Sequence, residues 1–558
     1  MRLYALVGTL LPIGAVAWAW YGLSVNVPKW DDHALKAFLL ALENETTVWG
    51  KVGQFLKQHN EHRIAYDRLL TWLDYHLFGK FSYQRLMAYG NLGLLALVVL
   101  LGTYLSRHAR RWYWFLPPVA LFIVSLAHWE NLYWALSAMQ NFGVVAWALW
   151  ALYALTYRPR PWLGIALATA ATLVSGNGFL VWPVGALVLL AQHRFRVLVP
   201  WLAAAVLLIA LYFYGYTAPP ANPPTRGTAF ELLTGWLAFL GAAADPLPVG
   251  SSYANSVALG TLLLGLWLYA FVQSIPGLRR PAGWSNREAF AFGVVAFLVG
   301  TAVVVVWGRY GYGRATLITS RYRIYSLTLL AITYCYWLLR TYKNPAWSAA
   351  VVGLLVSGLF WWAAFVNNTH ESIALRQYLL STQYNWTYTT NRPVSSIGGT
   401  TQRLIDKAPA YYDSALPTFF ASPIAPPSSP PFPVDTVFKT PDSYVIRLGA
   451  AGLQEAGFPS LTDPDRGVSV LLRSARRTYL FGAMPVPRRN WRVLLGRLPR
   501  YVIDSPADVS ILALDLDPGT YDVAIVVRRA GAVRQVRPTG QLLTVAPHAS
   551  AVRPNTNW

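Results

Sequence analysis

Two adjacent carboxylates, Asp31 and Asp32, follow the first long apolar run of the chain, within Trp30-Asp31-Asp32-His33. Carboxylates near hydrocarbon are energetically costly and usually have a function there. At the outer surface of a membrane, a carboxylate could accept a proton from an acceptor hydroxyl or hold a cation. The alternative is structural, because either aspartate could cap the following helix. We take both as candidate catalytic residues and His33 as a candidate binding residue.

A further acid, Glu130, is the only one in the short segment His128-Trp129-Glu130-Asn131-Leu132-Tyr133-Trp134. Its carboxylate could bind a metal, accept a hydrogen bond or orient another group. Trp129 and Trp134 either anchor the chain at a membrane interface or stack on the ring of a ligand. Asn131 is a further candidate binding residue, and Gln140 and Asn141, which open the next apolar run, could face the same cavity as Glu130.

A third cluster is Gln58-His59-Asn60-Glu61-His62-Arg63. Arg63 or the nearby Arg68 could contact a phosphate, and Glu61 or His62 could contact a polar ligand or a metal. The alternative is that the cluster is only the polar start of an interface helix capped by Asn60. No third ligand stands nearby at a normal spacing, so a zinc site is not expected.

The composition predicts a membrane protein. Of 558 residues, 55% are hydrophobic and 13% charged, whereas soluble domains carry roughly 25% charged residues. Apolar runs of about 20 residues, the length that spans a bilayer, recur along the chain. The single cysteine, Cys335, excludes an intramolecular disulfide and a cysteine metal cluster. The net charge of +22 suggests contact with anionic lipid or a phosphate-bearing polymer; nucleic acid is not an expected partner.

These runs predict a mainly α, polytopic membrane helix bundle of about eleven spans. We expect the spans near 3–23, 87–105, 113–127, 140–157, 162–175, 178–192, 197–215, 254–275, 289–307, 322–340 and 346–366. The first is expected to be an uncleaved span rather than a signal peptide. Ser175-Gly176-Asn177-Gly178 is compatible with a tight turn between two short spans or with a break in one long span.

The positive-inside rule predicts the orientation. Five alternate short loops are rich in arginine and lysine and are expected to be cytoplasmic: Arg107, Arg110 and Arg111; Arg158 and Arg160; Arg194 and Arg196; Arg279, Arg280 and Arg287; Arg340 and Lys343. The N-terminus then lies inside and the C-terminus outside. The protein is expected to be a multi-pass protein of the inner (plasma) membrane, with a periplasmic or extracellular C-terminal domain.

Four arginines break this rule, because Arg309, Arg314, Arg321 and Arg323 stand in or beside the outer loop 308–321. The planar fork of donors on arginine binds phosphate. A lipid phosphate headgroup is therefore one expected partner of Arg309, Arg321 and Arg323. The alternative is attraction to ordinary anionic lipid.

We divide the chain into a transmembrane domain 1–366, an extracytoplasmic connector 367–435 that is proline-rich at its end, and an extracytoplasmic β-rich domain 436–558. In the outer loop 24–86, Leu35, Phe38, Leu39 and Leu42 predict one amphipathic helix. Tyr66, Leu69, Leu70, Leu73 and Leu77 predict another, with Asp67, Thr71 and Asp74 opposite. Such helices could lie in the interface with the apolar face either in lipid or against the bundle. The strands of a small β-sandwich are expected near 444–448, 468–472, 491–495, 509–514, 523–527 and 533–536.

A first span, an outer loop that opens with paired acids, interface helices and many further spans together resemble the GT-C glycosyltransferases. The resemblance covers the topology and roughly residues 1–215. In that family an acid of the first outer loop is catalytic, which corresponds to Asp31-Asp32, and a second acid often stands in the next outer loop, which corresponds to Glu130. The second loop holds no aspartate, and no motif identifies a subfamily.

The resemblance implies an enzyme that transfers a sugar from a polyprenyl-phosphate donor to an acceptor on a surface polysaccharide, a glycolipid or a protein. A first-loop aspartate would be the general base and the anomeric configuration would invert. If a divalent cation such as Mg²⁺ or Mn²⁺ takes part, Asp32 and Glu130 are its expected ligands. Two other classes of protein stay open: a transporter or flippase of lipid-linked glycans, and a ligase that moves a whole lipid-linked glycan by means of arginines and a histidine. We see no internal repeat of the kind that transporters often show.

Overall fold

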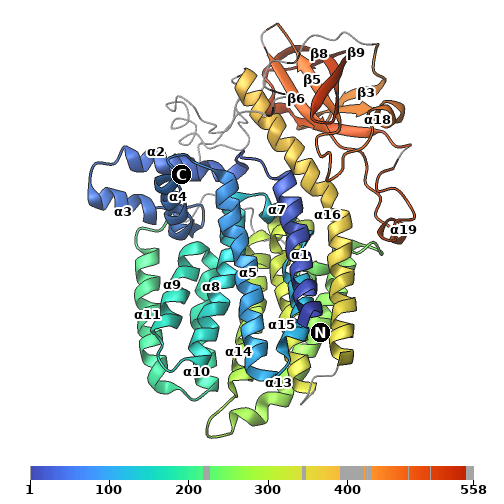
Figure 1. The fold of residues 1–558 in the computed structure, drawn as a ribbon. Coiled ribbons are helices and arrows are strands. Elements are labelled where there is room, and N and C mark those ends of the chain that lie inside the picture. Colours follow the sequence, from blue (N-terminus) through green and yellow to red (C-terminus); the bar gives the residue numbers. More distant parts are fainter. Residues whose placement is uncertain are drawn as a thin grey trace.

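Most of the described chain is helical. The computed structural model describes residues 2–217, 227–341, 347–389, 417, 420, 424, 430–475, 477–502 and 504–547, which form a helix bundle followed by a smaller region of strands (Figure 1). The helices before the strands are α1 Arg2–Leu23, α2 His33–Glu43, α3 Val48–Leu56, α4 Ala65–Phe78, α5 Tyr83–His108, α6 Leu116–Ile123, α7 Trp129–Leu132, α8 Ala135–Tyr157, α9 Trp162–Val174, α10 Val181–Ala191, α11 Phe195–Phe213, α12 Ala229–Leu240, α13 Ser252–Leu278, α14 Asn286–Arg309, α15 Arg323–Thr341 and α16 Trp347–Thr389.

Eight segments of the described chain are long and apolar enough to cross a membrane, judged by length and composition. They are Leu3–Leu23, Tyr83–His108, Trp112–Leu132, Ala135–Tyr157, Phe195–Phe213, Ser252–Leu278, Asn286–Tyr312 and Ser348–Asn385. Such helices indicate a multi-pass membrane protein.

The remaining three predicted spans are helices outside this set of eight. Two of them, α9 and α10, have 13 and 11 residues, fewer than the roughly 20 that a bilayer requires. Between them lies a short 3₁₀ segment, Gly176–Leu180. A Cβ atom at Gly178 would lie 2.1 Å from the carbonyl oxygen of Ala171, so only glycine allows the chain to pass here. The third is α15, which has 19 residues and carries several hydroxyl side chains.

The segment between α1 and α5 forms a layer at one end of the bundle (Figure 1). The predicted apolar face of α2 is confirmed, because Leu35, Phe38, Leu39 and Leu42 are all buried. The polar cluster 58–63 does not begin a helix. It forms a short hairpin of β1 Gln58–His59 and β2 His62–Arg63. Asn60 turns it with a φ of 49°, a left-handed conformation that asparagine tolerates.

Helix α4 turns its polar face toward the protein and its apolar face outward, one of the two arrangements that the sequence left open. Asp67, Thr71 and Asp74 are buried, whereas Leu69 and Leu77 are 44% and 74% exposed. This arrangement suits a helix whose apolar side contacts lipid and whose polar side contacts protein.

Helix α16 is much longer than the predicted last span. The span was expected to end near 366 and an extracytoplasmic connector to begin at 367, but the helix continues without a break to Thr389 and reaches the strands (Figure 1). Its outer half contacts strand β6. The guanidinium of Arg376 donates to both carboxylate oxygens of Asp465 at 2.9 and 2.8 Å. Most of the predicted proline-rich connector lies outside the described residues.

The C-terminal strands form two antiparallel sheets that share one buried apolar cluster. The strands are β3 Val434–Lys439, β4 Ser443–Leu448, β5 Gly467–Arg473, β6 Thr478–Ala483, β7 Ala507–Leu512, β8 Gly519–Arg529 and β9 Ala532–Val545, in the orders β3-β4-β7 and β6-β5-β8-β9. A short helix, α18 Ala450–Ala456, follows β4.

The predicted strand 491–495 is wrong, because Trp491–Leu494 forms the helical turn α19. The side chain of Asn490 caps this turn by accepting a hydrogen bond from the Val493 amide at 3.1 Å. Gly496 ends it with a φ of 68°. An Asn cap and a closing glycine are ordinary helix signals, and they outweigh the β-propensity of the residues between them.

Candidate functional site

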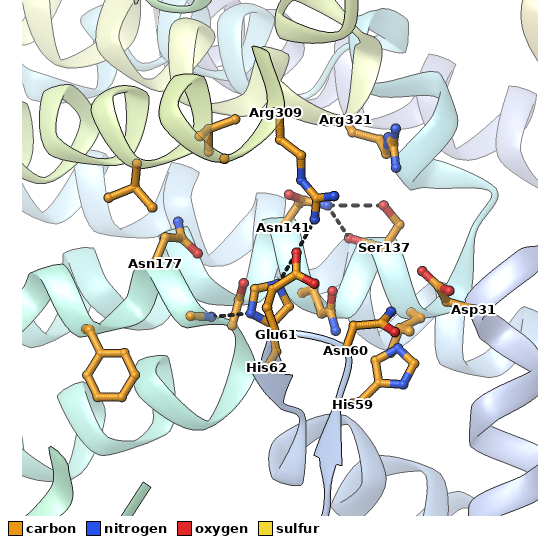
Figure 2. A pocket seen from close by; sticks show the side chains of 18 of the residues that line it. Asp31, His59, Asn60, Glu61, His62, Ser137, Asn141, Asn177, Arg309 and Arg321 are labelled. Carbon is orange, nitrogen blue, oxygen red and sulfur yellow. Dashed lines mark hydrogen bonds and ion pairs between the residues drawn. The ribbon is translucent and has the colours of Figure 1, made fainter. Parts of the chain in front are cut away.

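A polar cavity of about 380 Å³ lies where the segment between α1 and α5 meets the ends of the bundle helices. Its walls come from the 3₁₀ turn Trp30–Asp32, the β1-β2 hairpin, the first turns of α8, the segment Gly176–Leu180, and the ends of α11 and α14. Figure 2 shows ten of its polar side chains: Asp31, His59, Asn60, Glu61, His62, Ser137, Asn141, Asn177, Arg309 and Arg321. Segments far apart in sequence thus assemble one site.

Asp31 lines this cavity and is half-buried. Burial raises the pKa of its carboxyl to about 6, and the Glu61 carboxylate adds to the rise. Arg321, Arg309 and Lys29 act in the opposite direction. A carboxyl with this pKa is ionised near neutral pH and accepts a proton more readily than an ordinary aspartate.

Asp32 does not line the cavity and is fully buried. Its Oδ1 accepts the Leu136 amide at 2.7 Å and its Oδ2 accepts the Lys29 amide at 3.1 Å. Asp32 therefore ties the first loop to the start of α8. The two aspartates have different roles in the structure: Asp31 faces the cavity and Asp32 holds the chain that presents it.

Glu130 does not line the cavity either, and its carboxylate contacts the protein on both sides. One oxygen lies 2.7 Å from the Lys29 ammonium, and the other accepts the Ser320 hydroxyl at 3.2 Å and lies 3.4 Å from Arg321 Nε. The Lys29 ammonium sits 4.5 Å from the ring centres of both Trp30 and Trp134. Glu130 thus fixes the position of Arg321 rather than facing a ligand.

Two of the predicted arginines, Arg309 and Arg321, line the cavity. Arg309, from the last turn of α14, forms an ion pair with Glu61 of the hairpin (Figure 2). Arg321 lies over the Trp134 ring, with its guanidinium 5.4 Å from the ring centre. The cavity therefore holds two guanidinium groups, and guanidinium binds phosphate through paired N–H donors.

His62 lines the cavity beside Glu61. Its Nδ1 accepts the Gly176 amide at 3.2 Å, and its Nε2 lies 3.7 Å from the Glu61 carboxylate. Burial lowers the pKa of His62. Burial opposes ionisation of Glu61, but His62 and Arg309 outweigh it and lower the pKa of that carboxyl.

Three other predicted binding residues contact other parts of the protein and do not line the cavity. Arg63 donates to the backbone carbonyls of Leu56, Tyr212 and Tyr214. Arg323 is buried and pairs with Asp245. Asn131 is also buried, and its Nδ2 donates to the Arg321 carbonyl at 3.0 Å.

His33 and Trp129 are likewise absent from the walls of the cavity among the described residues. His33 is buried on the first turn of α2, and burial lowers its pKa to about 3. Trp129 packs against the core of the bundle. Both residues therefore belong to the packed protein rather than to the walls of the cavity.

The expectation that Gln140 and Asn141 face the cavity is confirmed. Residues that we did not predict come mainly from the break after α9 and from tyrosines at helix ends: Asn177, Tyr212, Tyr216, Tyr322 and Tyr325. Asn177 donates to the Tyr325 hydroxyl at 2.9 Å. In the sequence, the glycines on either side of Asn177 were the feature from which this part of the site could have been predicted.

The residues expected to bind a divalent cation do not form a metal site. The Asp32 oxygens accept backbone amides, and Glu130 is paired with Lys29 and Arg321. In the described part of the chain, no three His, Cys, Asp or Glu side chains come together in a way that could hold a metal ion.

Comparison with known proteins adds no assignment. No protein-family model, no curated protein and no solved structure matches this chain. The fold shows a many-helix protein, and eight of its described segments have the length and composition of membrane-spanning helices. The resemblance to GT-C glycosyltransferases stays a prediction.

Proposed function

We propose that this protein is a membrane glycosyltransferase that moves a sugar from a polyprenyl-phosphate donor to an acceptor hydroxyl in the 380 Å³ cavity. The observation that carries the proposal is that Asp31, a carboxylate with a raised pKa, shares this cavity with Arg309 and Arg321. A base and a pair of phosphate-binding cations are the two parts that such a transfer needs. We place the cavity at the outer face of the inner membrane, on the side of the C-terminal sheets.

In the proposed reaction, Asp31 takes the proton of the acceptor hydroxyl as its oxygen bonds to the anomeric carbon. The bond between that carbon and the donor phosphate oxygen breaks, and its electron pair leaves with the lipid phosphate. The added negative charge is stabilised by Arg321 and Arg309. A single displacement with base and leaving group on opposite faces of the sugar inverts the anomeric configuration.

The ion pair between Arg309 and Glu61 has a consequence for donor binding. A phosphate that enters the cavity competes with Glu61 for the Arg309 guanidinium. We therefore expect the donor to displace the Glu61 carboxylate, whereas Arg321 stays in position because Glu130 lies on its other side.

A glycan ligase is the second candidate, because His59, His62, Arg309 and Arg321 line the same cavity. A ligase of that kind would depend on the arginines and a histidine more than on Asp31. The two proposals differ in the effect of removing the Asp31 carboxylate.

The test uses the full chain in lipid nanodiscs with radiolabelled polyprenyl-phosphate sugars and a membrane extract as the source of acceptor. We expect Asp31→Asn to lower transfer by about 10²–10⁴-fold, the usual contribution of a general base. Glu43→Gln, which removes an exposed carboxylate on α2, is the matched control and should leave transfer unchanged. Full transfer by Asp31→Asn would overturn the base assignment, and movement of unreacted donor across the bilayer would favour a flippase.

A further inference from the structure

A second cavity, of about 600 Å³, lies between the outer half of α16 and the C-terminal strands. Helix α16 contributes Gln377, Tyr378 and Ser381, and strand β7 contributes Asp508 and Ser510. The remaining wall includes Trp30, which belongs to the turn that carries Asp31. This cavity therefore joins the strand region to the turn that presents the candidate base.

The two sides of this second cavity are firmly joined. Asn385 of α16 exchanges two hydrogen bonds with the backbone of Leu480 in β6, at 3.1 and 2.6 Å. The Arg376–Asp465 pair holds the same surfaces together nearby. A ligand would thus meet a preformed site and would not have to bring the two parts together.

Trp30 has an unusual conformation at the edge of this cavity. Its φ is 45°, a left-handed value that a bulky side chain rarely adopts, and such strain gathers at functional sites. The turn is held by the Lys29 amide, which donates to Asp32, and by edge-to-face contact of Trp30 with Trp134 at 5.4 Å. Trp30 lines the second cavity and Asp31 lines the first, and consecutive Cα atoms are only about 3.8 Å apart.

The lining of the second cavity combines aromatic and uncharged polar groups. Trp30 and Tyr378 are 43% and 45% exposed, so part of each ring is available to a ligand. Gln377 is 2% exposed, and its Oε1 accepts no hydrogen bond within the described part of the chain. Aromatic surfaces with a few placed polar groups suit a ligand that has apolar C–H faces and many hydroxyls.

The charge of the second cavity narrows the class of ligand further. Its charged lining residues are Asp508 and Asp515, and no lysine or arginine lines it among the described residues. Asp508 pairs with Arg447 of the neighbouring strand, at 2.7 Å. An acidic polysaccharide would meet no free cation here, whereas a neutral sugar chain would meet hydrogen-bond acceptors and rings.

We propose that the cavity between α16 and the strands binds the acceptor, and that the acceptor is a neutral carbohydrate chain stacked on Trp30 and Tyr378. This rests on the proposed glycosyl transfer, because the end of the bound chain would present its hydroxyl to Asp31 in the neighbouring cavity. The acceptor class is then a glycan rather than a protein side chain.

The experiment measures binding without any donor, so that it is independent of transfer. Saturation-transfer NMR would be recorded for mannotetraose, maltotetraose and chitotetraose with the full chain in nanodiscs, and for tetragalacturonate as the acidic comparison. We expect at least one neutral tetramer to bind and the acidic one not to bind. Tyr378→Ala should weaken binding about tenfold, through the loss of one aromatic contact. Ser510→Trp, which fills the cavity from an exposed position on β7, should abolish it.

The control for the filling variant is Leu542→Trp, which introduces the same side chain at an exposed position of β9 outside the cavity. It should bind as the parent does. Asp31→Asn should also bind the tetramers normally, because Asp31 does not line the second cavity. The acceptor site can therefore be confirmed even if Asp31 is not the base. The proposal is overturned if none of the three neutral tetramers binds, if tetragalacturonate binds as well as they do, or if Ser510→Trp and Leu542→Trp behave alike.

Discussion

The ammonium of Lys29 lies 2.7 Å from the carboxylate of Glu130, and both side chains are almost completely buried. The pair joins the loop after α1 to the short helix α7, which are 101 residues apart in sequence. It also holds residues of the candidate site in place, since Glu130 contacts Arg321 and Lys29 lies beside Trp30.

We expect Glu130→Gln to destabilise the protein by about 3–5 kcal/mol, because it leaves the Lys29 ammonium buried without its counter-charge. The double variant Lys29→Met/Glu130→Gln removes both charges and should recover most of that loss. Thermal unfolding in detergent, followed by the loss of soluble monomer, measures both. If the single and double variants are equally unstable, the ion pair is not what Glu130 contributes.

The raised pKa of Asp31 predicts how transfer depends on pH. A general base must be deprotonated, so the rate should fall as the pH drops through about 6 and be level above it. Arg321 lowers the pKa of Asp31 and Glu61 raises it. Arg321→Gln should therefore move the acid limb to higher pH, and Glu61→Gln should move it to lower pH.

The measurement is the pH profile of kcat/KM for the parent and these two variants. Each variant also changes donor binding, which alters the maximum value of kcat/KM. The pH at the midpoint of the acid limb still reports the pKa of Asp31. Shifts in the same direction for both variants would contradict the assignment of the acid limb to this carboxyl.

Asp67 predicts a pH dependence of stability that is separate from activity. It is fully buried on α4, neither carboxylate oxygen has a hydrogen-bond partner within the described residues, and burial raises its pKa well above the ordinary value of 3.8. Because the folded-state pKa is the higher one, the stability from this group is fully present below about pH 4 and is lost as pH rises toward the folded-state pKa.

Asp67→Asn removes this titration. The variant should be more stable than the parent at pH 7.5 and equal to it near pH 4, and melting temperatures at the two pH values check this. Asp74→Asn is the comparison on the same helix, because the Asp74 carboxylate is paired with Arg85 at 2.7 Å and its loss should destabilise. A parent that is no less stable at pH 7.5 than Asp67→Asn would contradict the prediction.

Helix α3 is expected to lie in the membrane interface. None of its residues is buried, and its apolar side chains Val48, Trp49, Val52 and Leu56 are 40% exposed or more. A nitroxide label at Trp49→Cys should be accessible to dissolved oxygen, and one at the exposed polar Lys51→Cys to a water-soluble nickel complex. The native Cys335 is fully buried and should not react. Equal water accessibility at both positions would place α3 outside the lipid.

Several features of this protein are determined locally and can therefore be predicted from sequence. The apolar runs became helices because a stretch of about 20 apolar residues has few other stable states. The spacing of Leu35, Phe38, Leu39 and Leu42 predicted the buried face of α2. The break near Gly176 was visible because glycines allow a backbone approach that other residues do not.

The composition of the candidate site was predictable in part. Asp31, His62, Arg309 and Arg321 were predicted and do line the cavity, since charged residues near apolar runs rarely stand there without a role. Which of Asp31 and Asp32 lines the cavity could not be predicted. It depends on the Leu136 amide, which is 104 residues away from Asp32.

Tertiary structure also decided which acids pair and which way α4 faces. Glu130 looked like a site residue because the sequence does not reveal its contact with Lys29. The apolar period of α4 is the same whether its leucines face protein or lipid, so only the surrounding bundle decides. The sequence by itself determined a helical membrane bundle with charged groups at one end, because hydrophobicity and helix period act over a few turns. The assembled cavity came only from the fold, because long-range hydrogen bonds and ion pairs select which of those groups face it.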